Sequence, residues 1–398
     1  MPGPIAARRP PPPRLRRLSW SSPRLRAQVY QVAAVLLLTL ALGLLVVNTL
    51  QNMRARGIQS GFDFLLQPAG FDIGEGWLRY ESVDPYWKAF LVGLVNTLRV
   101  AIFGCILTTV LGTLLGVGRF SRNALVRGVC YGYVELFRNI PVLLQLLMWY
   151  LLFTEYLPLP SDAWSFAGIA FVSKNGLSFP VLLWQPGYWF GLGGLMLGIV
   201  AAVGYARMAR VRFDQTGVPR PGASAAGLLV VGGAALGLLA GGAPLLFDYP
   251  FRSDIQIEGG SALSPEYLTV LIGLVLYTAS YVAEVVRAGI ASVAAGQNEA
   301  AAALGLTQRR TLRLVVLPQA LRPIIPPLTN QYLNLTKNSS LAVAVGYPDV
   351  VSIANTSLNQ SGRAVECIAV IMLVYLSLSL STSALMNWFN RRAALKER

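Results

Sequence analysis

Four ionisable side chains lie inside or beside long apolar segments, where they could bind or conduct a polar solute. They are Glu135, Arg138, Glu284 and Lys337. A charge at the centre of a membrane helix costs about 3 kcal/mol on insertion scales. We therefore expect each of these side chains to face protein or water rather than lipid.

Two of these residues have a partner of opposite charge three positions away. Glu135 precedes Arg138, and Glu284 precedes Arg287. Because residues three apart lie on the same face of a helix, each pair could form a local ion pair. For both pairs, the spacing favours this structural role over a role in a transport path.

Lys337 differs because it lies in a polar band. The neighbouring polar residues are Asn334, Thr336, Asn338, Ser339 and Ser340. Such a band in a membrane helix could line a water-filled path for a zwitterionic solute. The same spacing is equally compatible with a lysine that extends its ammonium group to the membrane surface, or with hydrogen bonds between helices.

The sequence lacks the patterns of common enzymatic sites. None of its lysines ends a G-x-x-x-x-G-K-[ST] phosphate-binding loop, and no G-x-S-x-G nucleophile motif occurs. The chain has no histidine, no carboxylate cluster with metal-ligand spacing, and three cysteines with no paired spacing, Cys105, Cys130 and Cys367. The sequence thus predicts a protein that is not an enzyme and has no metal or cofactor of its own.

Composition indicates a membrane protein. Hydrophobic residues make up 54% of the 398-residue chain and charged residues 13%, and the mean hydropathy is +0.54. Soluble domains carry about 25% charged residues. Eight apolar runs approach the length of about 20 residues that a spanning helix needs. They are 29–50, 91–117, 140–156, 188–206, 226–246, 267–290, 323–345 and 364–389. Pro141 interrupts the third run, and Pro326 and Pro327 interrupt the seventh.

The formal charge of +15 does not indicate nucleic-acid binding, because the basic residues are sorted by loop rather than gathered in one patch. The positive-inside rule places both termini in the cytoplasm. We expect residues 1–28, rich in proline and arginine, to be a disordered tail near anionic lipid. Residues 29–50 are expected to be an uncleaved anchor, 51–88 a periplasmic loop and 391–398 a short cytoplasmic tail.

The loop of residues 287–318 is rich in small residues and joins two apolar runs. Within it, Ala300–Leu304 is a strong helix-forming run. Glu299 is expected at the start of this helix, where the helix dipole favours a carboxylate, and Gly305 is expected to end it in a left-handed conformation. Pro318 should limit how far the next helix extends back toward the loop. The result would be a short helix whose alanine face can enter a groove on a partner.

The spacing of this loop resembles the EAA loop of ABC importer permeases. The matching positions are Glu299, Ala300, Ala301, Gly305, Val315, Leu317 and Pro318, with Val315 where the pattern usually has isoleucine. The resemblance implies docking on a cytoplasmic ATPase subunit, which would bind the ATP. The implied contacts are Gly296, Gln297, Glu299, Ala300, Ala301, Gly305, Leu317 and Pro318.

Further motifs resemble the polar amino acid subfamily of these permeases. They are GLVNTLRV (93–100), YVELFRNIPVLLQ (133–145), YVAEVVRAGI (281–290), GQNEAAAALGL (296–306), LPQALRP (317–323) and LTKNSSLA (335–342). In length and layout the chain is most similar to the Q-type permease subunit of general L-amino acid uptake systems. The resemblance implies an all-α integral membrane protein of the type I ABC importer permease fold, with a five-helix core in residues 89–153 and 265–390.

Two features add to that core, an N-terminal helix and an insertion of residues 154–264 that carries two helices. An even number of inserted helices preserves the sidedness of everything that follows. The insertion has glycines four residues apart, Gly194 with Gly198, and Gly233 with Gly237 and Gly241. This spacing suits close helix packing, although a general enrichment of small residues in membrane helices explains it equally well.

The resemblance also implies a transport path and partners. Candidate path residues are Arg138, Asn139, Glu284, Lys337, Asn338, Ser339 and Ser340. Arg138 and Asn139 belong to a motif near the path in the resembled family, although Asn139 and Ile140 replace its usual glycine and threonine. The expected partners are ATPase subunits, a second permease that is related or identical, a periplasmic amino acid-binding protein and the lipid of the bacterial inner membrane.

Two other functions stay open on the residues alone. A secondary transporter driven by an ion gradient would be favoured by carboxylates at unwound helix centres and by inverted repeats, and we find neither. A membrane scaffold without a transport path is opposed by Lys337 and its polar neighbours. The sequence therefore favours the permease subunit of an ATP-driven amino acid importer.

Overall fold

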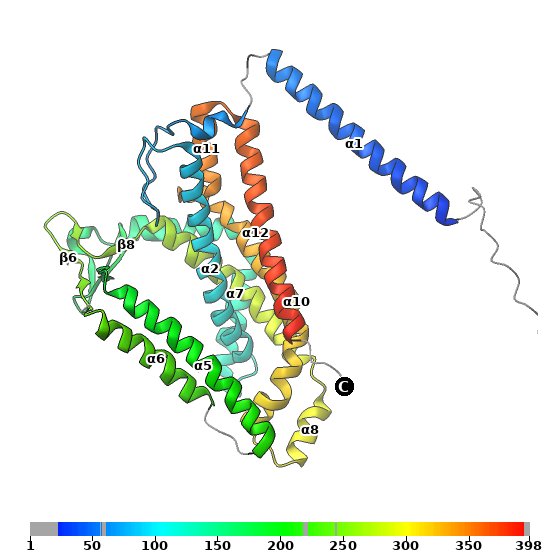
Figure 1. Cartoon of the computed structure of the whole chain (residues 1–398), viewed down its shortest axis with the longest axis vertical. Coiled ribbons are helices and arrows are strands. Elements are labelled where there is room, and N and C mark those ends of the chain that lie inside the picture. The colour runs from blue at the N-terminus through cyan, green and yellow to red at the C-terminus, as the bar shows by residue number, and fades with distance from the viewer. Residues whose placement is uncertain (1–22, 56, 58–60, 218–221, 243–244, 394–398) are drawn as a thin grey trace, which may run out of the picture.

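The structure, a computed structural model, describes residues 23–55, 57, 61–217, 222–242 and 245–393, and helices dominate it (Figure 1). The α-helices are α1 (Pro23–Ala55), α2 (Tyr86–Gly118), α3 (Ala124–Asn139), α4 (Val142–Leu151), α5 (Tyr188–Thr216), α6 (Gly222–Ala240), α7 (Pro265–Ala291), α8 (Ala295–Ala303), α9 (Gln308–Thr311), α10 (Leu317–Asn338), α11 (Val350–Ser361) and α12 (Ala364–Ala393). Shorter 3-10 and π-helical segments are η1 (Phe62–Leu66), η2 (Leu152–Tyr156), η3 (Pro160–Asp162), η4 (Leu312–Val316) and η5 (Ser339–Val345).

The first helix begins earlier than predicted. Residues 23–28, which we expected to be part of a disordered tail, form the first turns of α1. Pro23 suits the first position of a helix, and the arginine, leucine and alanine that follow favour helix, so the apolar run extends backward. Residues 1–22 of the predicted tail and 394–398 at the C-terminus lie outside the described residues.

Within the described residues, five helices are long and apolar enough to cross a bilayer: α1, α2, α5, α7 and α12. Two bent pairs raise this number to seven if each is one span: α3 with Val142–Tyr156, bent by 103°, and Gln308–Val345 with α11, bent by 50°. The helix α6 is apolar but shorter. Each of the eight predicted runs therefore falls mainly on helix, but the third and seventh belong to bent elements.

Helix α10 continues through its prolines. Pro323, Pro326 and Pro327 all lie inside α10, where the sequence predicted an interruption. Ala320 and Ile324 pack against α7, and this packing stabilises the helix despite the missing backbone donors. The regular helix ends instead at Asn338, where η5 continues as a 3-10 helix.

The centre of the molecule is the contact between α2 and α7. A Cβ atom added to Gly112 would lie 2.6 Å from the Cβ of Val282, and one added to Gly116 would lie 2.8 Å from the carbonyl oxygen of Ala283. These approaches require glycine. Since interfaces packed this closely do not deform gradually, α2 and α7 should move as one body.

A second hydrophobic cluster joins the segment before α2 to the C-terminal helices. Phe64 of η1 and Tyr86 pack with Val350 and Ile353 of α11 and with Cys367 of α12. This cluster lies at the end of the molecule opposite α8 (Figure 1).

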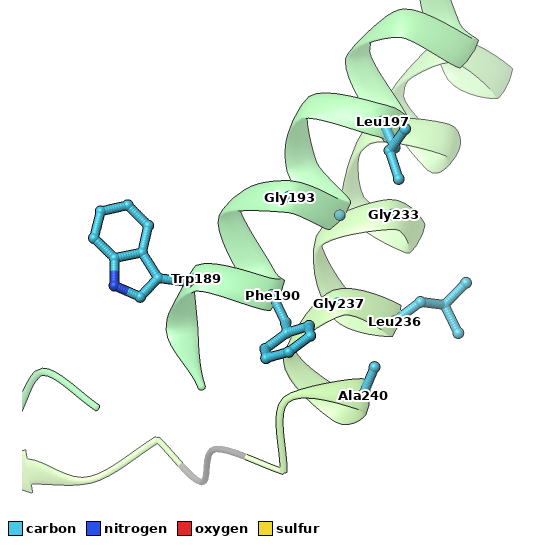
Figure 2. Close-up of a pocket in the computed structure, with 9 residues that line it drawn as sticks. Trp189, Phe190, Gly193, Leu197, Gly233, Leu236, Gly237 and Ala240 are labelled. Atoms are coloured by element: carbon cyan, nitrogen blue, oxygen red, sulfur yellow. The ribbon is translucent and has the colours of Figure 1, made fainter. Parts of the chain in front are cut away.

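The inserted helices α5 and α6 pack backbone to backbone. Figure 2 shows Gly233 and Gly237 of α6 against α5, while Trp189 and Leu236 project outward beside a groove of about 600 Å³. A Cβ atom at Gly198 would lie 2.6 Å from the carbonyl oxygen of Leu229, and additions at Gly194 and Gly233 would overlap backbone. Of the two explanations that the glycine spacing left open, the structure supports close helix packing.

The segments that flank this hairpin form β-structure, which the sequence did not predict. The strands are β1 (Trp164–Phe166), β2 (Ala170–Ser173), β3 (Gly176–Phe179), β4 (Val181–Leu182), β5 (Phe247–Asp248), β6 (Phe251–Arg252), β7 (Ile257–Glu258) and β8 (Ser261–Leu263). One antiparallel sheet has the order β1-β2-β3-β8, and β4 pairs with β5 and β6 with β7. Because β3 precedes the hairpin and β8 follows it, the sheet closes the insertion at its base.

Candidate functional site

The predicted docking loop forms a separate short helix at one end of the molecule (Figure 1). In this helix, α8, the predicted contact residues Gly296, Gln297, Glu299 and Ala300 are exposed. Ala301 is 3% exposed and turns toward the protein. The alanine face is therefore divided, with one side available to a partner and one side seated on the chain itself.

Gly305 ends α8 as the sequence predicts. Its φ is +73°, in the left-handed region. The Leu306 amide donates to the Ala301 carbonyl at 3.1 Å and the Gly305 amide to the Ala302 carbonyl at 2.9 Å. This pair of bonds is the Schellman pattern that satisfies the last carbonyls of a helix.

The expected position of Glu299 is wrong. The helix begins at Ala295, so Glu299 is its fifth residue and no acidic side chain lies in the first turn. Alanine and glutamine before Glu299 also favour helix, and they extend α8 toward the N-terminus. Glu299 is exposed on the helix surface and cannot interact with the N-terminal dipole at close range.

Pro318 does not stop the next helix as expected. Helical backbone continues upstream of α10 through the π-helical turn η4 and through α9 to Gln308. Proline lacks an amide donor, and the change of hydrogen-bonding register in η4 accommodates that gap. The side-chain amide of Gln319 donates to the Gln297 side chain at 3.1 Å, so α8 is tied to the start of α10.

An ion cluster lies just before the docking loop. The predicted Glu284–Arg287 pair is present, with a nitrogen–oxygen distance of 2.5 Å. Arg119, at the end of α2, approaches the other carboxylate oxygen of Glu284 at 2.5 Å and lies over the Tyr131 ring at 4.0 Å. The sequence analysis missed Arg119. Its only signal was its position directly after an apolar run.

Arg138 and Asn139 lie in the last turn of α3, before the sharp bend at Pro141. The expected Glu135–Arg138 ion pair is wrong: the Asn139 amide donates to the Glu135 carbonyl at 2.7 Å. The Arg138 guanidinium instead lies 5.3 Å from the centre of the Tyr281 ring on α7. An arginine over an aromatic face is attracted electrostatically, and this contact competes with the local carboxylate.

The bend after Arg138 is held by a buried glutamine that the sequence analysis did not single out. Gln145 is 1% exposed, and its side-chain amide donates to the carbonyls of Phe137 and Ile140, both at 2.9 Å. These bonds satisfy the end of α3 where Pro141 prevents a regular helix. A single polar residue inside the apolar stretch VLLQLL was the available signal.

The polar band lies where α10 changes into η5. The Ser339 hydroxyl donates to the Thr336 carbonyl at 2.7 Å, and the Ser340 hydroxyl donates to the Lys337 carbonyl at 2.8 Å. The serines are therefore satisfied within their own helix, while Lys337 is exposed. Among the described residues, no hydrogen bond or ion pair joins this band to Arg138 or Glu284. Arg138 lies nearer to Glu284, because the Tyr281 ring that it covers is three residues before Glu284 on α7.

Comparisons with known proteins agree with this arrangement. The model of the "Binding-protein-dependent transport system inner membrane component" family matches residues 263–395, which include α8. The chain is 44% identical over 377 residues to "General L-amino acid transport system permease protein AapQ" of Rhizobium johnstonii, covering 94% of each chain. It is also 44% identical over 382 residues to "Putative amino-acid ABC transporter permease protein YhdX" of Escherichia coli K12, covering 96% of this chain and 97% of that one.

The chain belongs to the amino-acid ABC transporter permeases. A further relative is "Glutamate/glutamine/aspartate/asparagine transport system permease protein BztB" of Rhodobacter capsulatus, 39% identical over 412 aligned residues that cover 94% of this permease and 95% of that one. The solved "Crystal structure of an amino acid ABC transporter with histidines" covers 77% of this permease at 21% identity, with a TM-score of 0.46. The alignment with the Rhizobium johnstonii permease covers 94% of both chains, so residues 154–264 have a counterpart in that relative.

Proposed function

We propose that this permease forms half of an inner-membrane path for amino acids and transmits the work of a separate ATPase through α8. The observation that carries this proposal is the exposed α8, held to α10 by Gln297 and Gln319 and following directly on α7. A short helix with a small-residue face can enter a groove, and any displacement of it acts on both neighbouring helices.

The ion cluster of Glu284, Arg287 and Arg119 supports the transmission of that displacement. Glu284 lies two turns before the end of α7 and is bonded to Arg119 of α2. Together with the glycine contacts of α2, this bond makes the two helices respond together when α8 moves. In this proposal Glu284 acts as a link between helices, while contact with the solute falls to other candidates.

The polar band is the proposed site of passage. Here the regular α-helix α10 changes into the 3-10 helix η5. Irregular backbone at membrane depth needs a cover of protein or water, so this transition suits a water-filled path. The Lys337 ammonium would attract the carboxylate of an amino acid, and Asn338 would offer an amide to either end of the solute. Arg138 and Asn139, at the bend after α3, are a second candidate for the path.

The proposed assembly contains further partners. ATPase subunits on the cytoplasmic side bind the ATP, a second permease subunit completes the path, and a periplasmic binding protein delivers the amino acid. Both termini are proposed to be cytoplasmic. An ion-gradient-driven transporter is the alternative, and it gives no role to the exposed α8.

The proposal is tested by Gly305→Val and Glu299→Lys in permease reconstituted with its ATPase and binding protein. A β-branched residue at a left-handed position costs about 1–2 kcal/mol, which lowers the population of the native loop by about tenfold. No atom lies within 4 Å of a Cβ at Gly305, so the strain is confined to the backbone. Uptake of labelled amino acid per ATP hydrolysed should fall in both variants, or the ATPase should dissociate.

Gly217→Val is the matched control. Gly217 also ends a helix in the left-handed region, with φ +67°, and also has open space around its Cβ position. The control should insert and transport normally, because Gly217 lies outside the docking loop. If both α8 variants retain full uptake and bind the ATPase at the normal ratio, the coupling role of α8 is wrong.

A further inference from the structure

A buried arginine lies thirteen residues into α2, at the end of the α2–α7 contact that is far from α8. The Arg99 side chain is 4% exposed and its Nη1 is 2.6 Å from Glu75 Oε1. Its guanidinium lies between two rings, 3.8 Å from the centre of Tyr267 and 5.2 Å from the centre of Trp77. The side chain is therefore enclosed by residues from three parts of the chain.

Glu75 connects further elements to this arginine. Its other carboxylate oxygen accepts a bond from the Ser264 hydroxyl at the start of α7. Asn96 of α2 donates to the Glu75 carbonyl and to the Pro348 carbonyl, both at 2.9 Å. We call Glu75, Asn96, Arg99, Ser264 and Tyr267 the outer clamp.

The spacing along α2 places the outer clamp at a membrane boundary. Arg99 and Arg119 are 20 positions apart, and no charged residue lies between them. At 1.5 Å per residue this stretch is about 30 Å long, the thickness of the hydrocarbon core. Since Arg119 belongs to the ion cluster beside the docking loop, the outer clamp marks the opposite surface of the bilayer.

The part of the clamp that carries Glu75 has little regular structure. Between η1 and α2 the described residues form no helix or strand, and the base of the segment is closed by the Pro68–Pro85 bridge and by backbone hydrogen bonds from Ala69 to Asp84 at 2.9 Å and from Gly70 to Ser82 at 2.8 Å. Beside the clamp is a polar pocket of about 380 Å³, lined by residues that include Asp72, Glu75, Ser264 and Thr356. Phe71 and Tyr80 pack the two sides of the segment against the Phe64 cluster, and the Glu75–Arg99 pair holds the part between them. This part can be released from Arg99 without unfolding a helix.

The energetics of the Glu75–Arg99 ion pair favour a role in selecting one conformation over a role in raising the stability of the fold. A buried ion pair contributes little net stability, because the desolvation of its charges offsets their attraction. Such pairs instead select one arrangement among alternatives. Arg99 Nε has no hydrogen-bond partner, so the enclosed charge depends on Glu75.

We propose that the outer clamp positions the segment 67–85 over the outer end of the transport path, and that the Glu75–Arg99 pair opens when that end opens. This inference rests on the proposed importer function. Glu75 and Arg99 are positioning residues, because neither is placed in contact with the solute. Ser264 directly follows β8, so the clamp also connects the inserted sheet to this opening.

The first test measures ATPase activity of the complete reconstituted transporter without binding protein. Glu75→Gln and the double variant Glu75→Gln/Arg99→Gln should each raise this basal rate by about tenfold, because a resting outward-open population near 1% has room for such a shift. The double variant leaves no unpaired buried charge, so its result does not depend on whether the fold tolerates a buried Arg99 that has lost its carboxylate partner. A merely structural pair would lower assembly without raising basal ATPase activity.

Asp84→Asn is the matched control. Asp84, at the base of the same segment, and Lys88 of α2 form an equally short ion pair of 2.6 Å, but their side chains are 23% and 31% exposed. The hydrogen bond from Lys88 holds the pKa of Asp84 below its usual range, so the pair is formed at neutral pH. Its removal should leave the basal rate within about twofold of wild type, as expected for an exposed pair.

The second test locks the segment in place. In a background with Cys105, Cys130 and Cys367 replaced by serine, Glu75→Cys and Ser264→Cys are joined by a short bis-methanethiosulfonate, which forms a reducible disulfide with each cysteine and releases methanesulfinate. Uptake should fall below about a tenth of the untreated level and return on reduction, since a locked population cannot open. Normal uptake in the cross-linked transporter, or unchanged basal ATPase activity in both clamp variants, would overturn the clamp. Absence of amino acid uptake by the wild-type complex would instead overturn the proposed function.

Discussion

At the scale of single residues, the charged side chains of this permease divide into those that are satisfied within the chain and those that are not. Glu284 has two arginine partners, and Arg99 is enclosed by Glu75 and two rings. Lys337 is exposed in the polar band at the end of α10. A lysine in that position is the residue most open to a solute or to a second subunit.

Lys337→Met tests this assignment. If the ammonium group attracts the solute carboxylate, its loss removes a charge-assisted hydrogen bond, and uptake should fall by about tenfold or more at low solute concentration. Lys337→Arg should retain part of the activity. The measurement is initial uptake in proteoliposomes at equal amounts of assembled complex.

Lys174→Met serves as the comparison for charge alone. Lys174 lies in the inserted segment with its side chain 33% exposed, and its ammonium nitrogen is 3.9 Å from a Glu155 carboxylate oxygen, a separation that contributes little. Normal uptake by Lys337→Met at normal expression would assign Lys337 to helix packing or to the membrane surface.

At the scale of elements, glycine contacts decide which helices form one body. The α5–α6 pair is built on glycines that face each other, and its close approach leaves no room for a larger side chain. For the glycines next to these on each helix, no atom of another residue lies near the position of an added Cβ atom. The insertion is therefore a firmly paired hairpin whose ends are closed by the β3–β8 sheet.

Gly233→Val and Gly232→Val compare these two surroundings on adjacent residues of α6. A Cβ at Gly233 would lie 2.9 Å from Gly198 Cα, whereas nothing lies within 4 Å of one at Gly232. Overpacking costs about 1–3 kcal/mol, so Gly233→Val should lower the Tm of the purified permease by about 5 °C or more. Gly232→Val has the same helix propensity and should leave the Tm close to wild type. Equal Tm values for the two variants would contradict the backbone contact.

At the scale of the whole molecule, the charge distribution, the ion cluster and the outer clamp predict the same orientation of the permease in the membrane. Basic residues are concentrated in the loops and tails assigned to the cytoplasm, and the Arg119–Glu284–Arg287 cluster lies at that end. The outer clamp, the β-structure of the insertion and the Phe64 cluster then face the periplasm. This orientation brings α8 to the side where ATP is available.

Cysteine labelling checks the orientation directly. In a cysteine-free background, Asp254→Cys, between β6 and β7, should react with a membrane-impermeant maleimide added to intact spheroplasts. Gln308→Cys, at the start of α9, should react only after the membrane is opened. Labelling of Asp254→Cys solely from the cytoplasmic side would refute the proposed topology.

The sequence by itself determined the features that depend on neighbouring residues. Apolar runs placed the helices, the loop spacing located α8, and glycine at position 305 predicted its left-handed end, because each follows from local propensity and composition. Tertiary structure alone decided the pairing of Glu75 with Arg99, the joining of β3 to β8, and the pairing of Glu284 with Arg119, its second arginine partner. The tertiary structure also allows α10 to continue through its prolines, because packing against α7 outweighs the loss of backbone hydrogen-bond donors. These outcomes depend on contacts between residues far apart in the chain, and no local pattern of types and spacing contains them.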